Sequence, residues 1–122
     1  MYNSTTLFSV EGKIAVITGG SQGLGAMIAR GLAENGARVY ITSRSPEKCQ
    51  ATAEDISQYG DCRALPADIS STEGRSSLVR RFGDQEEKLD ILINNAAIFT
   101  AVERKGFDEI SVDEWDLMHA VN

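Results

Sequence analysis

Residues 18–25 read T-G-G-S-Q-G-L-G and have the composition of a loop that binds a phosphate group. Small residues let the backbone approach a phosphate closely, and a helix that begins in such a loop directs free N–H groups at the anion. No G-K-[ST] follows, so the loop lacks the lysine with which a P-loop binds a triphosphate. The pattern also differs from G-x-G-x-x-G, because Ile28 occupies the position of the third glycine. We therefore predict a diphosphate-binding loop for a dinucleotide, and the alternative is a tight turn that binds nothing.

Ser43 and Arg44 directly follow the second predicted strand, where a side chain normally decides which dinucleotide binds. An acid at this point hydrogen-bonds the ribose 2′-OH and excludes a 2′-phosphate. Residues 36–46 contain no Asp or Glu, whereas a hydroxyl and a guanidinium are well suited to a phosphate. The sequence thus favours NADP as the cofactor, with NAD possible. The alternative for Arg44 is an ordinary solvated surface charge.

The elements that must position these residues alternate between strands and helices. We predict strands over residues 13–18, 38–42, 62–66 and 89–93. One helix runs from the glycine loop to residues 35–36, and the next is capped by Ser45, has Pro46 at its first position and stops near Gly60. Two further helices are expected after capping boxes, formed by Ser70 with Glu73 and by Ser111 with Glu114.

The first strand has an apolar run without alternation, which is typical of a strand buried on both faces of a parallel sheet. Strands that alternate with helices of this length need right-handed crossovers. The prediction is an α/β fold, a Rossmann-type doubly wound parallel sheet truncated after about four strands. Residues 1–122 would form one partial NAD(P)-binding domain.

The composition bounds the partners and the compartment. A net charge of −6 gives no electrostatic basis for binding nucleic acid or an anionic membrane. No apolar run approaches the roughly 18 residues of a membrane span, and the first ten residues do not form a secretory signal. Cys49 and Cys62 form no C-x-x-C pair and are interpreted as reduced, buried thiols. We therefore expect a cytoplasmic protein.

The spacing T-G-x-x-x-G-x-G resembles that of the short-chain dehydrogenase/reductase family, and three later motifs match the family in order. These are Asp68 after the third strand, Asn94-Asn95-Ala96-Ala97 for the family's N-N-A-G, and Val121-Asn122. The resemblance, from about residue 9 to residue 122, implies an NADP-dependent oxidoreductase that transfers hydride to or from a carbonyl or alcohol on a small molecule. It also implies homo-oligomers for a complete relative.

Asp68, Asn94 and Asn95 receive roles from the resemblance. Asp68 would accept a hydrogen bond from the adenine amino group, although it could instead cap the following helix. Asn94 and Asn95 would tie the strand end to neighbouring backbone and line the ribose, although a plain Asx turn needs no cofactor. The full set of expected cofactor-binding residues is Thr18, Gly19, Ser21, Gln22, Gly23, Leu24, Gly25, Ser43, Arg44, Asp68, Ile69, Asn94, Asn95 and Ala96.

Asn122 is the one expected catalytic residue. In the family, an Asn in this context belongs to a tetrad of Asn, Ser, Tyr and Lys and holds a water of the proton relay. Trp115, Met118 and Asn122 have the spacing of one helical stripe, which we predict to face inward. The other tetrad members are missing, because no Y-x-x-x-K occurs in the chain.

Several departures from the family pattern leave alternatives open. Gln22 stands where many NADP-using relatives have a basic residue, and Ala97 replaces the glycine of N-N-A-G. The missing tetrad members make a non-catalytic dinucleotide-binding or interaction module the alternative function. We favour an incomplete sequence, inactive by itself, because the fourth strand would otherwise leave Ile91 and Ile93 on an unpaired edge.

Residues 59–68 are similar to the 3-oxoacyl-[acyl-carrier-protein] reductase-like branch of the family, particularly its rhamnolipid-biosynthesis type. That similarity implies a 3-oxoacyl thioester as substrate. It concerns the cofactor-binding part of the sequence.

Overall fold

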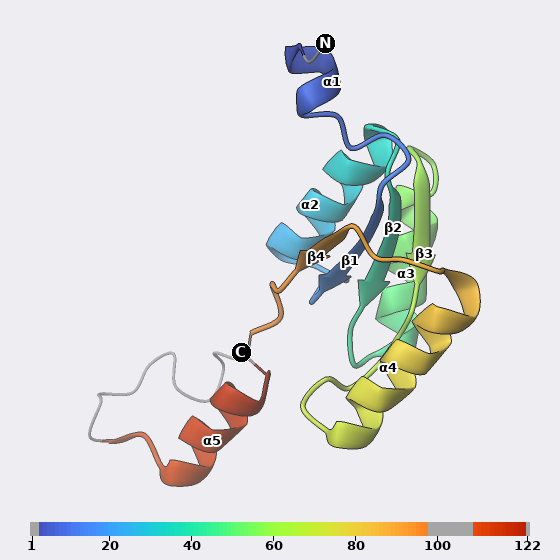
Figure 1. Cartoon of the computed structure of the whole chain (residues 1–122). Coiled ribbons are helices and arrows are strands. Elements are labelled where there is room, and N and C mark those ends of the chain that lie inside the picture. Colours follow the sequence, from blue (N-terminus) through green and yellow to red (C-terminus); the bar gives the residue numbers. More distant parts are fainter. Residues whose placement is uncertain (1–2, 98–108, 122) are drawn as a thin grey trace.

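The computed structural model describes residues 3–97 and 109–121, which contain four strands and five helices. The strands are β1 (Ile14–Thr18), β2 (Arg38–Thr42), β3 (Asp61–Ala64) and β4 (Ile91–Ile93). The helices are α1 (Ser4–Leu7), α2 (Gly23–Glu34), α3 (Pro46–Ile56), α4 (Thr72–Gln85) and α5 (Val112–Val121). All strand pairs are parallel, and the order β3-β2-β1-β4 confirms the predicted Rossmann-type sheet (Figure 1).

The central strand β1 is buried along its whole length, as its unbroken apolar run predicted. Its neighbours are β2 on one side and β4 on the other, with Ile17 opposite both Ile41 and Ile93. The ladder to β2 ends at the pair Thr18 and Thr42. Both strands therefore end at the same level, and the segments that follow them start side by side.

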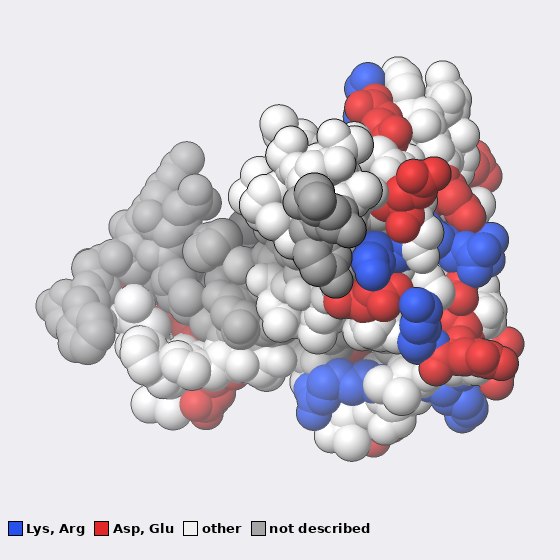
Figure 2. Space-filling view, turned by 45° about the horizontal axis from the view of Figure 1, so that its top comes forward, with Lys and Arg blue, Asp and Glu red and all other residues white. Residues whose placement is uncertain are grey.

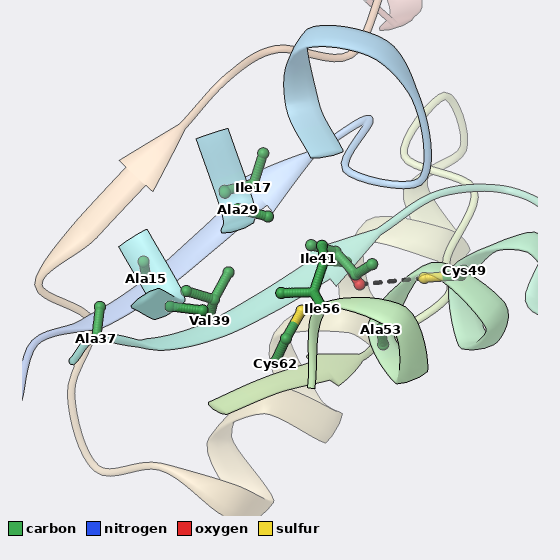
Figure 3. Packing of buried hydrophobic residues seen from close by; sticks show 11 residues of the cluster. Ala15, Ile17, Ala29, Ala37, Val39, Ile41, Cys49, Ala53, Ile56 and Cys62 are labelled. Atoms are coloured by element: carbon green, nitrogen blue, oxygen red, sulfur yellow. Dashed lines mark hydrogen bonds between the residues drawn. The ribbon is translucent and has the colours of Figure 1, made fainter. Parts of the chain in front are cut away.

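Helices α2 and α3 cover one face of the sheet through small side chains (Figure 3). Ala29 and Ala33 of α2 and Ala53 of α3 are buried against the strands, so these helices lie close to the sheet. Cys49 and Cys62 are free and buried in this layer, as predicted, and the Cys49 thiol donates to the Ile41 carbonyl oxygen at 3.2 Å. Burial raises the pKa of Cys62 to about 12, which keeps it a thiol at neutral pH.

Helix α4 covers the opposite face. Leu78 and Phe82 of α4 pack against the cluster that contains Tyr40 and Leu65. The Tyr40 and Phe82 rings meet edge to face, with 5.2 Å between their centroids. Glu86, the C-cap residue of α4, accepts hydrogen bonds of 2.7 Å from the Tyr40 hydroxyl and from Nη1 of Arg38. These hydrogen bonds fasten the end of α4 to the sheet.

Most helix starts are confirmed. Ser45 caps α3 with Pro46 in its first turn, and Ser111 and Glu114 exchange the two hydrogen bonds of a capping box before α5. The Ser70 and Glu73 capping box is wrong, because Ser71 caps α4 by accepting from the Gly74 N–H.

Three predicted strands also differ from the structure in their boundaries, and the first begins at Ile14 instead of Lys13. The third strand begins at Asp61 and ends at Ala64, and the fourth begins only at Ile91. The short helix α1 was not predicted. A capping box between Asn3 and Thr6 caps its N-terminus, and Phe8, which follows its last residue, is exposed.

Trp115 is 49% exposed, so the predicted inward-facing stripe is wrong for the one member whose side chain the structure describes. The Trp115 ring lies against His119 of the same helix, 4.5 Å between centroids. Asn122 lies outside the described residues. Within the described part of the chain, no helix has both the length and the apolar character to cross a bilayer.

Candidate functional site

A cavity of about 360 Å³ lies where the carboxyl ends of β1 and β2 meet the segments that follow β3 and β4. This is the place at which open α/β sheets bind their ligands. Its lining residues are Gly19, Ser21, Gln22, Leu24, Thr42, Ser43, Arg44, Ala67, Asp68, Ile69, Asn95, Ala96 and Ala97. Four stretches that are separate in the sequence thus line one cavity.

Most of the predicted cofactor-binding residues are in this lining. Thr18, Gly23, Gly25 and Asn94 are not, and the predicted catalytic Asn122 lies outside the described residues. Thr42, Ala67 and Ala97 line the cavity without having been predicted to bind. Thr42 ends the apolar strand β2 and precedes Ser43, and this adjacency is the signal that could have identified it.

The glycine loop is built by close backbone contacts. Gly19 and Gly23 have φ values of +67° and +56°, a region that side chains with a Cβ rarely occupy. A Cβ on Gly25 would lie 2.2 Å from the carbonyl oxygen of Gly19, and one on Gly19 would lie 2.9 Å from Cα of Ala96. Gly25 is therefore needed for α2 to pack under the loop.

Helix α2 begins at this loop with its first N–H groups uncapped by a side chain. Its N-cap residue, Gln22, makes no side-chain capping hydrogen bond, and no acidic residue lies in the first turn. The helix start therefore offers N–H donors and a positive dipole end beside a cavity that Gln22 and Leu24 line. This arrangement fits a diphosphate.

Thr18 joins β1 to the segment after β4. Its hydroxyl accepts hydrogen bonds of 3.0 Å from the N–H groups of both Asn95 and Ala96, and donates to the Ile93 carbonyl. Asn95 adds a 3.2 Å hydrogen bond from its side-chain amide to the Gly19 carbonyl. The prediction that Asn95 ties the strand end to neighbouring backbone is confirmed, whereas Asn94 is exposed.

Asp68 lies on the other side of the cavity, where its carboxylate is held by Ser70. Its Oδ1 accepts from the Ser70 N–H at 3.0 Å and from the Ser70 hydroxyl at 2.6 Å. These hydrogen bonds, and the nearby Arg44 charge, lower the pKa of Asp68 below its ordinary value. The carboxylate is ionised at neutral pH, and it does not cap α4, since Ser71 does.

Ser43 and Arg44 complete the lining beside Asp68. Ser43 is half-buried and Arg44 is exposed, so the guanidinium can move to meet a ligand. Acidic and basic side chains are interspersed on the face shown in Figure 2, with no large surface of one sign. The cavity instead combines one guanidinium, one carboxylate and a helix start within a short distance.

Comparison with known proteins identifies the fold family. The model of the short chain dehydrogenase family matches residues 13–122. The chain belongs to the short-chain dehydrogenase family. The chain is 54% identical, over 89 residues, to the rhamnolipids biosynthesis 3-oxoacyl-[acyl-carrier-protein] reductase of Pseudomonas aeruginosa. That match covers 73% of this chain and 35% of the relative.

Solved structures give the same result. The Pseudomonas aeruginosa RhlG/NADP active-site complex superposes with a TM-score of 0.84 at 44% identity, covering 93% of this chain and 43% of that one. A 3-ketoacyl-(acyl-carrier-protein) reductase from Brucella melitensis, complexed with NADH, has a TM-score of 0.82 at 33% identity, covering 93% and 45%. The chain therefore spans less than half the length of these relatives.

The described side chains offer a dinucleotide more partners than they offer a metal ion. Among residues 3–97 and 109–121, no group of three or more His, Cys, Asp or Glu side chains is placed to hold a metal. The hydroxyl of Thr42 is buried and has no hydrogen-bond partner in that part of the chain. Thr42 is the most buried residue of the cavity lining, 1% exposed.

Proposed function

We propose that this chain is the cofactor-binding part of an NADP-dependent short-chain oxidoreductase. The observation that carries the proposal is the cavity at the end of β2, which Ser43 and Arg44 line in a stretch, residues 36–46, that contains no acid, and which the uncapped start of α2 also borders. An NADP complex among the similar structures supports this choice of cofactor, although another is a complex with NADH. The chain would act as one NAD(P)-binding domain.

Each side of the cavity has a distinct role in this proposal. The diphosphate side, residues 18–25, binds the diphosphate through backbone N–H groups at the start of α2. The adenosine side consists of Ser43, Arg44 and residues 65–71, with Asp68 accepting from the adenine amino group and Arg44 binding the 2′-phosphate. Asn95 and Ala96 line the ribose between them. The bound nicotinamide supplies the hydride chemistry.

Substrate and catalysis are proposals that extend beyond the described residues. The 3-oxoacyl-[acyl-carrier-protein] reductases among the similar proteins support a 3-oxoacyl thioester, reduced at its carbonyl. Asn122 would hold a water of the proton relay, as the family resemblance implies. We also propose a cytoplasmic homo-oligomer, supported for the compartment by the two buried, free thiols.

The test uses the complete polypeptide that contains this chain. NADPH oxidation is measured with 3-oxoacyl thioesters, and NADPH and NADH affinities are measured by calorimetry. Arg44→Ala should weaken NADPH binding by roughly tenfold and leave NADH unchanged, because the lost contact is to the 2′-phosphate. Lys48→Ala, an exposed cation on α3 outside the cavity, is the matched control. Equal affinities of the unsubstituted protein for both cofactors would contradict the NADP assignment.

A further inference from the structure

The loop after β3, residues 65–71 and here called the Asp68 loop, is fixed to the sheet along one edge. The Leu65 N–H donates to the Ile41 carbonyl at 2.9 Å, and the Ala67 N–H donates to the Ser43 carbonyl at 3.0 Å. These bonds continue the pairing of β3 with β2 beyond the last strand residues. They use the N–H groups of Leu65 and Ala67, so the carbonyl groups of the loop need hydrogen-bond donors from another element.

Helix α4 supplies those donors. Nη2 of Arg81 donates to the Pro66 carbonyl, and Nη1 of Arg75 donates to the Ile69 carbonyl at 2.8 Å. Pro66 and Ile69 flank Ala67 and Asp68, so the two guanidinium groups hold the backbone on both sides of the cavity-lining carboxylate. Hydrogen bonds from a charged donor are stronger than neutral ones, and two of them restrict this short segment.

The first turn of α4 contacts the same loop between these two points. The Asp68 carbonyl oxygen lies so near the helix that a Cβ on Gly74 would be 1.7 Å from it. The Ser71 N–H and hydroxyl both point to that carbonyl, at 3.4 Å and 3.3 Å. The backbone of Asp68 is therefore seated directly on α4.

Both arginines are oriented by their own helix. Nε of Arg81 donates to the Ser77 hydroxyl at 3.1 Å, and Nη2 of Arg75 reaches the Thr72 hydroxyl at 3.3 Å. The helix itself is immobilised against the sheet by Phe82 and by the buried Glu86 carboxylate, 6% exposed, which Tyr40 and Arg38 both contact. The Asp68 loop is thus held by α4, which is itself fixed to the sheet on the face opposite α2 and α3 (Figure 1).

We propose that Arg81 and Arg75 are positioning residues for the adenosine side, which hold the Asp68 loop so that the carboxylate of Asp68 is presented to the adenine amino group. Neither arginine lines the cavity, so both act through Asp68. The inference rests on the proposed NADP-binding function.

The experiment compares two fragments of the cofactor on the complete polypeptide. Adenosine 2′,5′-bisphosphate reports on the adenosine side, and reduced nicotinamide mononucleotide reports on the remainder of the site. The variants are Arg81→Met and Arg75→Met, with Arg80→Met as the matched control, because Arg80 is an exposed arginine of the same helix. Affinities are measured by isothermal titration calorimetry, and folding is checked by circular dichroism.

Each replacement should weaken bisphosphate binding roughly tenfold and change nicotinamide mononucleotide binding by less than about twofold. Arg80→Met should change neither affinity. Arg81→Lys should recover part of the loss, because an ammonium group keeps a charged donor in reach of the Pro66 carbonyl.

Unchanged bisphosphate affinity in either folded methionine variant would overturn the proposal, and so would equal losses for both fragments, which would indicate general destabilisation. Arg75 is exposed, so its replacement tests the proposal even if Arg81→Met does not fold. Failure of the unsubstituted protein to bind the bisphosphate is a different result. It would contradict the proposed function before any variant is considered.

Discussion

Close backbone contacts shape the diphosphate side of the cavity. On the adenosine side, side chains do this work, because they hydrogen-bond the Asp68 carboxylate and the carbonyl groups of its loop. On the diphosphate side, Gly25 lets the helix lie against the carbonyl of Gly19. On the adenosine side, Ser70 holds the Asp68 carboxylate and Arg81 holds the loop below it. At Gly25 the diphosphate side has no room for a side chain, whereas on the adenosine side single side chains can be replaced without a backbone clash.

The most damaging substitution should be Gly25→Ala. Its Cβ would lie 2.2 Å from the Gly19 carbonyl oxygen and 2.6 Å from Nδ2 of Asn95, and backbone cannot yield as a flexible side chain can. We expect a loss of about 3 kcal/mol in the free energy of unfolding, measured by urea denaturation, together with loss of cofactor binding.

Gly31→Ala is the control for this change, in the same helix α2. A Cβ there meets nothing within 4 Å, so the substitution should stabilise by about 0.5–1 kcal/mol through higher helix propensity. Equal effects of the two alanines would show that close packing does not define the diphosphate side.

Thr18→Val should have the next largest effect. The valine keeps the shape of the side chain but removes the acceptor for the Asn95 and Ala96 N–H groups. We expect a loss of about 2–3 kcal/mol in unfolding free energy, since two half-buried donors lose their partner. Thr18→Ser keeps the hydroxyl and should recover most of that loss in the same measurement.

Asp68→Asn should give a smaller and pH-dependent effect. The folded-state pKa of Asp68 lies below its ordinary value of 3.8, so the ionised carboxylate stabilises the fold above that pH. As the pH falls through the lowered value, the contribution disappears, and the two proteins should become equally stable. Urea unfolding of both proteins between pH 2 and pH 7 measures this difference. A difference in stability that stays constant across that range would contradict the role of Ser70 as its partner.

Thr42→Val should have the smallest effect, and its sign should be opposite to that of Thr18→Val. The two threonines face each other in the β1–β2 ladder, but the Thr42 hydroxyl is buried without a partner in the described part of the chain. Removing it should raise the free energy of unfolding by up to about 1 kcal/mol. A loss as large as that of Thr18→Val would indicate that the Thr42 hydroxyl is hydrogen-bonded.

The sequence predicts the sheet well because its strongest signals are local. The apolar run of β1 and the Ser45 and Pro46 start of α3 each depend on neighbouring residues only, and the structure has both. Ser70 and Ser71 are equally good caps in sequence terms, and the choice of Ser71 depends on how Gly74 fits against the Asp68 carbonyl. A contact that depends on how a loop folds back onto a helix leaves no periodic signal.

The site was partly predictable for the same reason. Glycines and the Ser43-Arg44 pair are recognisable by type and spacing, and the structure brings them to one cavity. Arg75 and Arg81 look like ordinary charges of an amphipathic helix, because their carbonyl partners lie 6 and 15 residues away along the chain. The inward orientation predicted for Trp115 is wrong because periodicity identifies a helical face and does not say whether anything covers it.

The two buried thiols also have a practical consequence for spectroscopy. Cys62, with its pKa near 12, and Cys49, whose thiol is buried in the α3–sheet layer, should not react with maleimides while the protein stays folded. A single cysteine placed at Val79, 71% exposed on α4, would then be the only reactive label in this chain. A fluorophore there would sit on the helix that carries Arg75 and Arg81, which the Phe82 and Glu86 contacts hold to the sheet, so its emission would report on the surroundings of a fixed helix.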